Sequence, residues 1–502
     1  MSAYYITWLT ASAIDHPIAA LIVAFVSALV CWSVVGYARS PLRKYPGPPL
    51  AAWTNYWMVY HASRGSMHEI NKWLHEKYGP AVRVGPNMLS LDCPSLIKTC
   101  FDVRGIWRKT EFYTVSGVRS NGRITYNIFS ETDNEEFTRT KRPIAKYFSV
   151  NGVLQFQVAW DMVGKATYGK RIGYLDHGHD FDDTIYKAAT ASDYLSTIGM
   201  HPSLDMFLDK NRIYRIGPPS FHSLVALSMQ HLMDRYSGKD KHDPAKPDFL
   251  AGYIESKAEY PDVVDDERII SYLLVNLSAG ANTTAVLLRS IIYLSLKHPT
   301  VWSRLEAEIL AAPFAQKSPP TNLPAPYSEA RILPYLEAVV RESNRLWPGD
   351  CFPMQRYVPA SGLNLPDGSF VPEGVIVGFN AFVLHRNKDF WGHDAEDFRP
   401  ERWLRDEKGG ESEAEYKQRL TRMNNHDLSF GGGNRKCLGQ HLGLMQVYKT
   451  VATLIGLYEF ELVHPEKDWT IKTSIFRRQS GIELKLRKRP GMEIREDVGL
   501  DE

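Results

Sequence analysis

Apolar residues recur mainly at helical spacing along this chain, so most of the sequence predicts α-helix. The longest helical segment runs from about Asp265, which is suited to an N-cap, to Lys297, where a His-Pro pair follows. Its centre, LSAGANTTAVLL, carries no charge, which predicts a helix buried on most sides. Strand-like stretches are short and lie near the two ends, at residues 81–91 and 480–487. We therefore predict a mainly α fold with small β-sheets.

A long apolar run lies near the start of the chain. Residues 17–38 carry no charged side chain, and about 20 apolar residues suffice to cross a bilayer as a helix. The alternatives are a buried core helix and a signal peptide, whose apolar region is shorter. Arg39, Arg43 and Lys44 follow the run and no Lys or Arg precedes it, which predicts a luminal N-terminus and a cytosolic remainder. We expect residues 1–44 to be a membrane anchor and the proline-rich residues 45–50 to be a stiff hinge.

Composition and charge narrow the classes of function. The chain has 502 residues, with 59 basic and 57 acidic side chains, and this near balance argues against a nucleic-acid partner. A hydrophobic share of 44% supports a large core, and no linker is evident after residue 50, so we expect residues 45–502 to form one domain. The five cysteines show no CxxC pattern, which argues against a disulfide framework and a zinc site.

One decapeptide, FGGGNRKCLG, carries most of the chemical information in the sequence. It sets the lone Cys437 in a glycine-rich loop, directly before an amphipathic run, as thiolate ligation of a haem iron requires. Glycines let the backbone approach the iron closely, and the start of a helix offers amide donors and a positive dipole end to the anion. Arg435 can reach a haem propionate, and Phe430 can pack against the haem. The alternative is a buried structural cysteine beside a glycine turn.

The spacing Phe-x-x-Gly-x-Arg-x-Cys-x-Gly is matched by Phe430, Gly433, Arg435, Cys437 and Gly439. On this motif the chain resembles the cytochrome P-450 superfamily of haem-thiolate monooxygenases. The resemblance implies haem b (iron protoporphyrin IX) as the cofactor, Cys437 as the iron ligand and the fold of that superfamily.

The long helix contains a second motif of the family, Ala279-Gly280-Ala281-Asn282-Thr283-Thr284. The resemblance makes it the oxygen-binding groove: Ala279 and Thr283 face the same way, Gly280 leaves room, and Thr283 assists oxygen activation. The alternative is a helix contact of small residues with a threonine bonded to its own backbone. Asn282 departs from the family, which has an acid here, and an amide cannot carry a proton by ionising. Water or Thr284 could then supply the proton route.

Three further residues match the family's support for the haem loop. Glu342 and Arg345 form its Glu-x-x-Arg pair, and Arg402 in FRPERW is the third member. Arg356 matches a position that contacts a haem propionate. Lys141 falls where the family has an arginine, with Arg142 as an alternative; an ordinary solvated basic patch is the other interpretation of this pair.

The resemblance spans essentially the whole chain, and residues 161–180 and 385–403 resemble fungal microsomal members of the pisatin demethylase type. It implies a single-pass protein of the endoplasmic reticulum, fed electrons by the NADPH-cytochrome reductase, with cytochrome b5 as a further candidate donor. The substrate is expected to be a lipophilic terpenoid, polyketide or alkaloid intermediate. By alignment of elements, its pocket should draw on residues 110–125, 194–207, 351–354 and 474–476 and on the long helix before Ala279. Two alternatives stay open: a haem-thiolate isomerase, dehydratase or oxidative coupling enzyme, which Asn282 favours, and a membrane-bound haem sensor.

Overall fold

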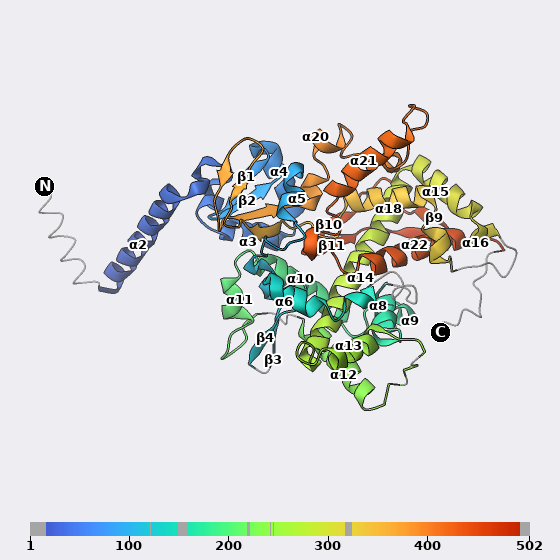
Figure 1. Cartoon of the computed structure of the whole chain (residues 1–502), viewed down its shortest axis with the longest axis horizontal. Helices are drawn as coiled ribbons and strands as arrows, with labels where there is room; N and C mark the ends of the chain where they lie inside the picture. Colours follow the sequence, from blue (N-terminus) through green and yellow to red (C-terminus); the bar gives the residue numbers. More distant parts are fainter. Residues whose placement is uncertain are drawn as a thin grey trace, which may run out of the picture.

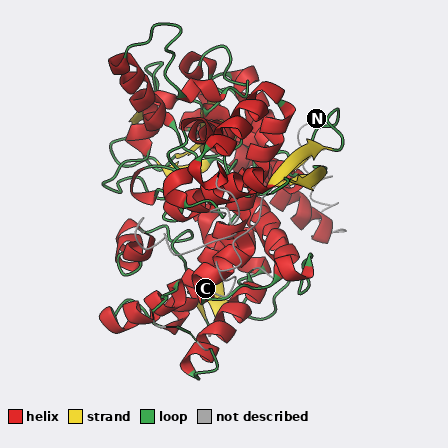
Figure 2. Ribbon diagram, turned by 90° about the vertical axis from the view of Figure 1, so that its right-hand side faces the viewer, coloured by secondary structure: helices red, strands yellow, loops and turns green. Residues whose placement is uncertain are grey.

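The computed structural model of this protein describes residues 17–120, 122–148, 159–217, 221–240, 242–243, 245–316 and 324–491. Helices make up most of these residues, and the strands form small sheets (Figures 1 and 2). The predicted fold class, mainly α with small β-sheets, is confirmed.

The described helices range from single turns to one of 32 residues. The α-helices are α2 (Pro17–Arg39), α3 (Tyr56–Arg64), α4 (Met67–Tyr78), α5 (Ile97–Cys100), α6 (Asn134–Lys141), α8 (Ala159–Tyr168), α9 (Tyr174–His177), α10 (Thr184–Ile198), α11 (Ser203–Leu208), α12 (His222–Tyr236), α13 (Phe249–Glu259), α14 (Asp266–Lys297), α15 (Pro299–Ala311), α16 (Pro313–Gln316), α17 (Tyr327–Ala330), α18 (Pro334–Leu346), α19 (Ala381–Leu384), α20 (Lys388–Trp391), α21 (Glu413–His426) and α22 (Gln440–Leu457). The 3-10 helices are η1 (Pro41–Lys44), η2 (Pro49–Ala52), η3 (Pro94–Leu96), η4 (Glu111–Ser116), η5 (Ala145–Phe148), η6 (Pro400–Trp403) and η7 (Gly433–Arg435).

The largest sheet has the order β1-β2-β8-β5, in which only β2 and β8 run parallel. The pairs β3–β4, β6–β7, β9–β12 and β10–β11 are antiparallel. The strands are β1 (Ala81–Gly85), β2 (Met88–Leu91), β3 (Val118–Ser120), β4 (Arg123–Thr125), β5 (Met354–Tyr357), β6 (Leu363–Asn364), β7 (Phe370–Val371), β8 (Ile376–Phe379), β9 (Tyr458–Leu462), β10 (Thr470–Thr473), β11 (Arg477–Ser480) and β12 (Leu484–Lys488).

The two stretches predicted as strands fare differently. Residues 81–91 form the antiparallel hairpin β1–β2, as expected. The stretch 480–487 is divided between two strands, because β11 ends at Ser480 and β12 begins at Leu484. Gly481 has φ +79°, a conformation that a regular strand does not allow. The sequence pattern therefore predicted strand structure here but missed the turn between β11 and β12.

Helix α14 is the predicted long helix. The side chain of Asp265 accepts a hydrogen bond from the Arg268 N–H at 2.8 Å, which confirms Asp265 as the N-cap. Leu273 and Leu277 are fully buried in one hydrophobic cluster and Ile291 in another. Figure 1 shows α14 in the middle of the molecule, with α8 and α22 close by, and both pack against it.

Helix α2 covers the apolar run predicted to be a transmembrane helix. Its large side chains are exposed, among them Phe25 at 65% and Trp32 at 81%, so nothing in the described part of the chain covers them. The helix is long and apolar enough to cross a membrane, whereas α14, which also passes this test, is mostly buried within the fold. Figure 1 shows α2 projecting from the rest of the molecule. These features suggest a membrane anchor.

The proline-rich segment after α2 is packed against the largest sheet. The Arg83 N–H of β1 donates to the Pro46 carbonyl at 2.8 Å, and the Tyr45 hydroxyl is 3.0 Å from Ser369 Oγ. A side chain at Gly47 would collide with the Arg83 carbonyl, so only glycine fits there. These contacts hold residues 45–47 in place, and the stiffness of the hinge stays a prediction.

Residues 317–326 are rich in proline and residues 405–415 in charge, which predicts two solvated connections. Most of residues 317–326 lies outside the described residues. The charged segment 405–415 is largely exposed, and it leads into α21 through a capping box between Ser412 and Glu415.

Candidate active site

One cavity gathers most of the residues that the sequence singled out. Its wall contains parts of α14, residues 428–439, the segment after α18 and the turn between β10 and β11. The segments expected to line a substrate pocket contribute Tyr113, Ser116, Leu195, Met354, Ile475 and Phe476. A second cavity, bordered by η4, α11 and β8, contains neither Cys437 nor Thr283.

The cysteine loop, residues 430–439, is shaped by backbone contacts. The Cys437 N–H donates to the Phe430 carbonyl at 2.8 Å, which closes the loop on itself. Gly433 has φ +61°, and a side chain there would fall on the carbonyl oxygens of Phe101 and Asp102. Gly439 has open space where a side chain would point, and it borders the cavity. Packing within the protein thus requires Gly433, whereas Gly439 leaves room on the cavity side.

The side chain of Cys437 lies on the wall of this cavity, surrounded by protein and accessible from the cavity. Burial by the surrounding protein raises the pKa of its thiol, and a hydrogen bond from the Gly439 N–H and the charge of Lys436 oppose that rise. Helix α22 begins at Gln440, three residues after Cys437, so the predicted placement at the helix start is corrected to the preceding turn. The expected amide donor exists and is the Gly439 N–H.

Five cationic residues border the cavity: Lys109, Lys141, Arg356, Arg435 and Lys436. None of them forms an ion pair with a carboxylate in the described part of the chain. Burial, followed by the nearby Arg356 and Arg435, holds the pKa of Lys109 well below its usual range. Burying unpaired cations is unfavourable, so this wall is suited to an anionic group. Sequence reasoning missed Lys109; its position directly before the expected pocket segment 110–125 was the available signal.

Arg435 is held by the segment that leads into α6. Its guanidinium donates to the Asn134 Oδ1 at 2.7 Å and to the carbonyls of Glu131 and Asp133 at 2.8 and 3.0 Å, and it stacks on Phe137. Burial, and next the charge of Arg356, lower the pKa of Arg435 to about 10. Arg435 therefore joins the cysteine loop to the α6 region and adds positive charge to the cavity wall.

The choice between Lys141 and Arg142 has a structural answer. Lys141 borders the cavity, and its Nζ lies 3.5 Å from the Asn434 carbonyl of the cysteine loop. Burial and the charge of Arg435 lower the pKa of Lys141. Arg142 is exposed and does not border the cavity. Of the two, only Lys141 is positioned to contact a group bound there.

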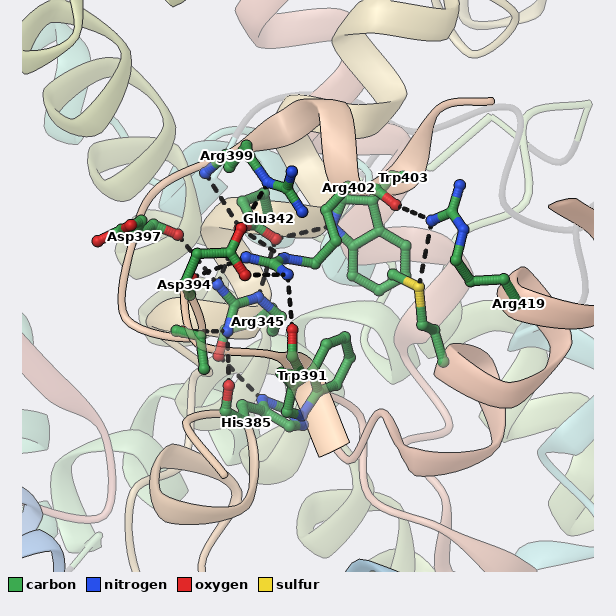
Figure 3. Close-up of polar contacts among 12 residues, drawn as sticks. Glu342, Arg345, His385, Trp391, Asp394, Asp397, Arg399, Arg402, Trp403 and Arg419 are labelled. Carbon is green, nitrogen blue, oxygen red and sulfur yellow. Dashed lines mark hydrogen bonds and ion pairs between the residues drawn. The ribbon is translucent and has the colours of Figure 1, made fainter. Parts of the chain in front are cut away.

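Glu342, Arg345 and Arg402 form a buried ionic network, which Figure 3 shows. Arg345 donates to both carboxylate oxygens of Glu342 at 2.8 Å, and Arg402 Nε lies 3.4 Å from Glu342 Oε1. The Trp403 indole N–H at 2.8 Å and the Arg399 backbone N–H at 3.1 Å complete the carboxylate's partners. Sequence reasoning missed Trp403, although it belongs to the same FRPERW segment.

The two arginines use their remaining N–H groups to hold backbone carbonyls. Arg345 and Arg402 bring together residues 385–397, which follow the strands of the largest sheet in sequence. The accepting carbonyls are those of His385, Ala395 and Asp397 for Arg345, and of Trp391 and Asp394 for Arg402. The network therefore fixes the path of the chain, and it does not border the cavity.

His385 connects this network to the cysteine loop. The Leu428 N–H donates to His385 Nε2 at 3.0 Å, so the ring is neutral there and Nδ1–H donates to the Arg345 carbonyl at 2.9 Å. Burial, the main cause, lowers the pKa of His385 to about 4. Leu428 lies two residues before Phe430, so these two hydrogen bonds join the ionic network to the loop that carries Cys437. Sequence reasoning did not single out His385.

Helix α14 contributes Ala279, Gly280 and Thr283 to the cavity wall. The Thr283 hydroxyl donates to the Ala279 carbonyl at 2.8 Å, the backbone bond considered above as an alternative. A side chain on Gly280 would lie 3.2 Å from Val163 Cγ2, so the missing side chain serves the contact with α8. Asn282 does not border the cavity, and its amide donates to the Ser278 carbonyl at 3.0 Å. Gly280 thus borders the cavity and also meets α8 closely, and its role in leaving room for a ligand stays a prediction.

The residues present fit a haem. A cysteine on the cavity wall, a glycine that leaves room beside it, and cations without carboxylate partners match a thiolate ligand and two propionates.

Comparisons with known proteins agree with this geometry. The sequence profile of the cytochrome P450 family matches residues 131–486. The chain is 50% identical to the cytochrome P450 monooxygenase cfoH of Aspergillus candidus, over 97% of this chain and 95% of that protein. It is 29% identical to a cytochrome P450 monooxygenase of Aspergillus terreus, over 85% of this chain and 92% of that protein. It is 28% identical to the cytochrome P450 monooxygenase vrtE of Penicillium aethiopicum, over 89% of this chain and 90% of that protein. The chain belongs to the cytochrome P450 family, as its cysteine motif predicts.

Proposed function

We propose that this protein is a haem-thiolate monooxygenase that inserts one oxygen atom from O2 into a lipophilic intermediate of fungal secondary metabolism. The observation that carries the proposal is the placement of Cys437 and Thr283 on the wall of one largely apolar cavity. The relatives that are named monooxygenases, over nearly their whole length, support it.

Haem b bound in this cavity would supply the activation of O2 at its iron. Cys437 would ligate the iron, and Lys109, Lys141, Arg356 and Arg435 would bind the propionates. Phe430, Gly433 and Gly439 would shape the loop beside the haem. Glu342, Arg345 and Arg402 would hold that loop from outside the cavity, with no part in the chemical step.

Thr283 is the residue we propose to assist oxygen activation. Its hydroxyl proton is bonded to the Ala279 carbonyl, so the oxygen lone pairs are available to accept a hydrogen bond from water on the wall. Asn282 lies off the wall, and Thr284 borders the cavity. A proton route through water and Thr283 or Thr284 therefore fits these positions better than one through Asn282.

The partners and location follow from the same proposal. Electrons would come from the NADPH-cytochrome reductase or cytochrome b5, as membership of the family implies. With α2 as a single-pass anchor, residues 45–502 would form the catalytic domain on the cytosolic face of the endoplasmic reticulum. The similarity of residues 161–180 and 385–403 to the pisatin demethylase type stays a prediction.

The alternative chemistries receive no support from the site. Isomerisation, dehydration or oxidative coupling was favoured by Asn282 alone, and that side chain does not border the cavity. A membrane-bound haem sensor would not need Thr283, so Thr283→Ala would leave a sensor unchanged. Under our proposal the same change lowers product formed per NADPH consumed, by at least about tenfold.

The experiment compares metabolite profiles of the native host with and without the gene by accurate mass. An accumulating precursor that lacks one oxygen atom of the lost product supports monooxygenation and identifies the substrate. Restoration by the wild-type gene, and not by Cys437→Ala, ties the change to this site. A precursor and product of equal mass, or differing by water, would contradict the proposal.

A further inference from the structure

Asp350 is the one carboxylic acid among the described residues that line the cavity. It lies in the segment between α18 and β5, directly after Gly349. A side chain on Gly349 would lie 3.4 Å from Thr283 Cγ2, so this segment packs against the threonine proposed to assist oxygen activation. The carboxylate therefore belongs to the part of the wall where the reacting end of a substrate has to lie.

The bonding of Asp350 leaves acceptor capacity toward the cavity. Its Oδ1 accepts a hydrogen bond from the Phe352 N–H at 2.8 Å, which holds the side chain in a local turn. No hydrogen bond to Oδ2 and no ion pair of Asp350 occurs among the described residues. Burial raises the pKa of Asp350 to about 6, and the Phe352 N–H, Lys109 and Arg477 limit that rise. The group is thus a carboxylate at neutral pH that has one oxygen for a ligand.

The surroundings indicate which ligand would suit this oxygen. Aromatic rings of Tyr113, Phe129, Phe221 and Phe476 line the same cavity and favour a flat apolar ligand. The wall also carries the five cationic residues described above, so a positively charged ligand would be repelled. A neutral hydrogen-bond donor avoids this repulsion and can use the free carboxylate oxygen. A hydroxyl is such a donor, and it needs an acceptor once it is removed from water.

We propose that Asp350 accepts a hydrogen bond from a neutral hydroxyl group on an aromatic substrate and so orients that substrate against Thr283. This inference rests on the proposed function, of which it specifies the substrate class. It makes Asp350 a specificity-determining residue, since the ligand without a hydroxyl would leave a buried carboxylate oxygen without a partner.

The test uses two probes that differ in one group, 2-naphthol and 2-methoxynaphthalene. Their dissociation constants are measured by calorimetry with the full-length holoenzyme in lipid nanodiscs. We expect the wild type to bind 2-naphthol more tightly than 2-methoxynaphthalene. In Asp350→Ala this preference should fall by about tenfold or more, as for a lost hydrogen bond to a charged group. Because both probes partition into the same lipid, the change in ratio between variants reports Asp350.

Two variants separate recognition from local folding. Asp350→Asn keeps an oxygen for the Phe352 N–H and so preserves the local turn, but it places an NH2 donor where Oδ2 stood. Because that NH2 can donate to the oxygen of either probe, most of the discrimination should be lost. Asp367→Ala removes the equivalent bond to Ser369, 2.9 Å long, from an exposed turn outside the cavity, and should leave the ratio unchanged. All variants should retain the thiolate band of the reduced carbon monoxide complex, which checks the haem site.

Three outcomes decide the matter. An unchanged ratio in Asp350→Ala would overturn the inference. Asp350-dependent binding that is tighter for trimethyl-2-naphthylammonium than for 2-naphthol would overturn the choice of a neutral donor. Asp350-dependent binding of 2-naphthol supports the inference even if products contain no oxygen from O2, a result that would overturn the proposed function alone.

Discussion

The loop that carries Cys437 and the facing part of the wall, formed by α14 and residues 349–354, are held in different ways. The cysteine loop is joined through His385 to a network of fully buried charges in which Glu342 has four donor residues. The α14 side relies on apolar packing and on bonds within the helix, such as that of Thr283 to Ala279. The first region is built to fix one geometry, whereas the second leaves polar groups such as Asp350 available to a ligand.

This difference explains which residues a motif can predict. A loop that positions an iron ligand tolerates little variation, so its residues recur at fixed spacing. Under the proposed function the α14 side meets the substrate, and its polar residues depend on the particular ligand.

The largest effect is expected from Cys437→Ser. A serine hydroxyl is not a thiolate, so the variant should lose the haem-thiolate band of the reduced carbon monoxide complex together with all activity. Absorption spectroscopy of the purified protein measures both haem content and ligation. Cys31→Ser, on the exposed face of α2, should leave the band unchanged. A retained band in Cys437→Ser would show that another residue ligates the iron.

The buried network should be far more sensitive than an exposed pair on the same helix. Glu342→Gln leaves Arg345 and Arg402 without their carboxylate and should destabilise the fold by about 3–5 kcal/mol, with loss of bound haem. Glu337→Gln removes a partly exposed pair with Arg341, 3.6 Å apart on α18, and should cost less than about 1 kcal/mol. Urea unfolding followed by circular dichroism measures both. Equal costs would contradict the contrast between the buried network and its surroundings.

Sequence reasoning located the cysteine loop, the long helix and the Glu342–Arg345–Arg402 set, because each depends on local spacing. It missed Lys109, His385 and Asp350, because their roles depend on which distant segments the fold brings together. His385 meets Leu428 across 43 residues, and no periodicity encodes that contact. The sequence also could not show that Val163 of α8 lies against Gly280, because this contact joins two helices far apart in the chain.

The link through His385 should make the cysteine loop sensitive to acid. The folded pKa of about 4 lies below the ordinary value of 6.5, so the unfolded chain takes up a proton first as pH falls. Stability is therefore lost between pH 6.5 and about 4, by at most about 3 kcal/mol from this residue. Denaturant unfolding measured at several pH values in this range gives the free energy of unfolding. That free energy should fall less with decreasing pH for His385→Gln than for the wild type.

The control for this experiment is His464→Gln, which removes a more exposed histidine near Glu466 and Glu483. Its pH dependence should follow that of the wild type. If His385→Gln also followed the wild type, His385 would not hold the neutral bond to Leu428 on which the link depends.

The smallest effect is expected on α14. Gly280→Ala places a methyl group against Val163 and should destabilise the protein by about 1–2 kcal/mol through overpacking. Val163→Ala in the same chain should relieve most of that cost in a double-mutant cycle of thermal unfolding. If Gly280→Ala kept its stability and lost activity instead, the glycine would serve the space above the haem.

The central claim is most directly tested by supplying 18O2 to the full-length enzyme in nanodiscs, with the NADPH-cytochrome reductase and the precursor that accumulates without the gene. The account predicts a product that carries one atom of 18O, absent from the Cys437→Ser reaction, with no label taken from H2 18O. A product that forms without label from O2 would contradict it and would assign this site to another chemistry.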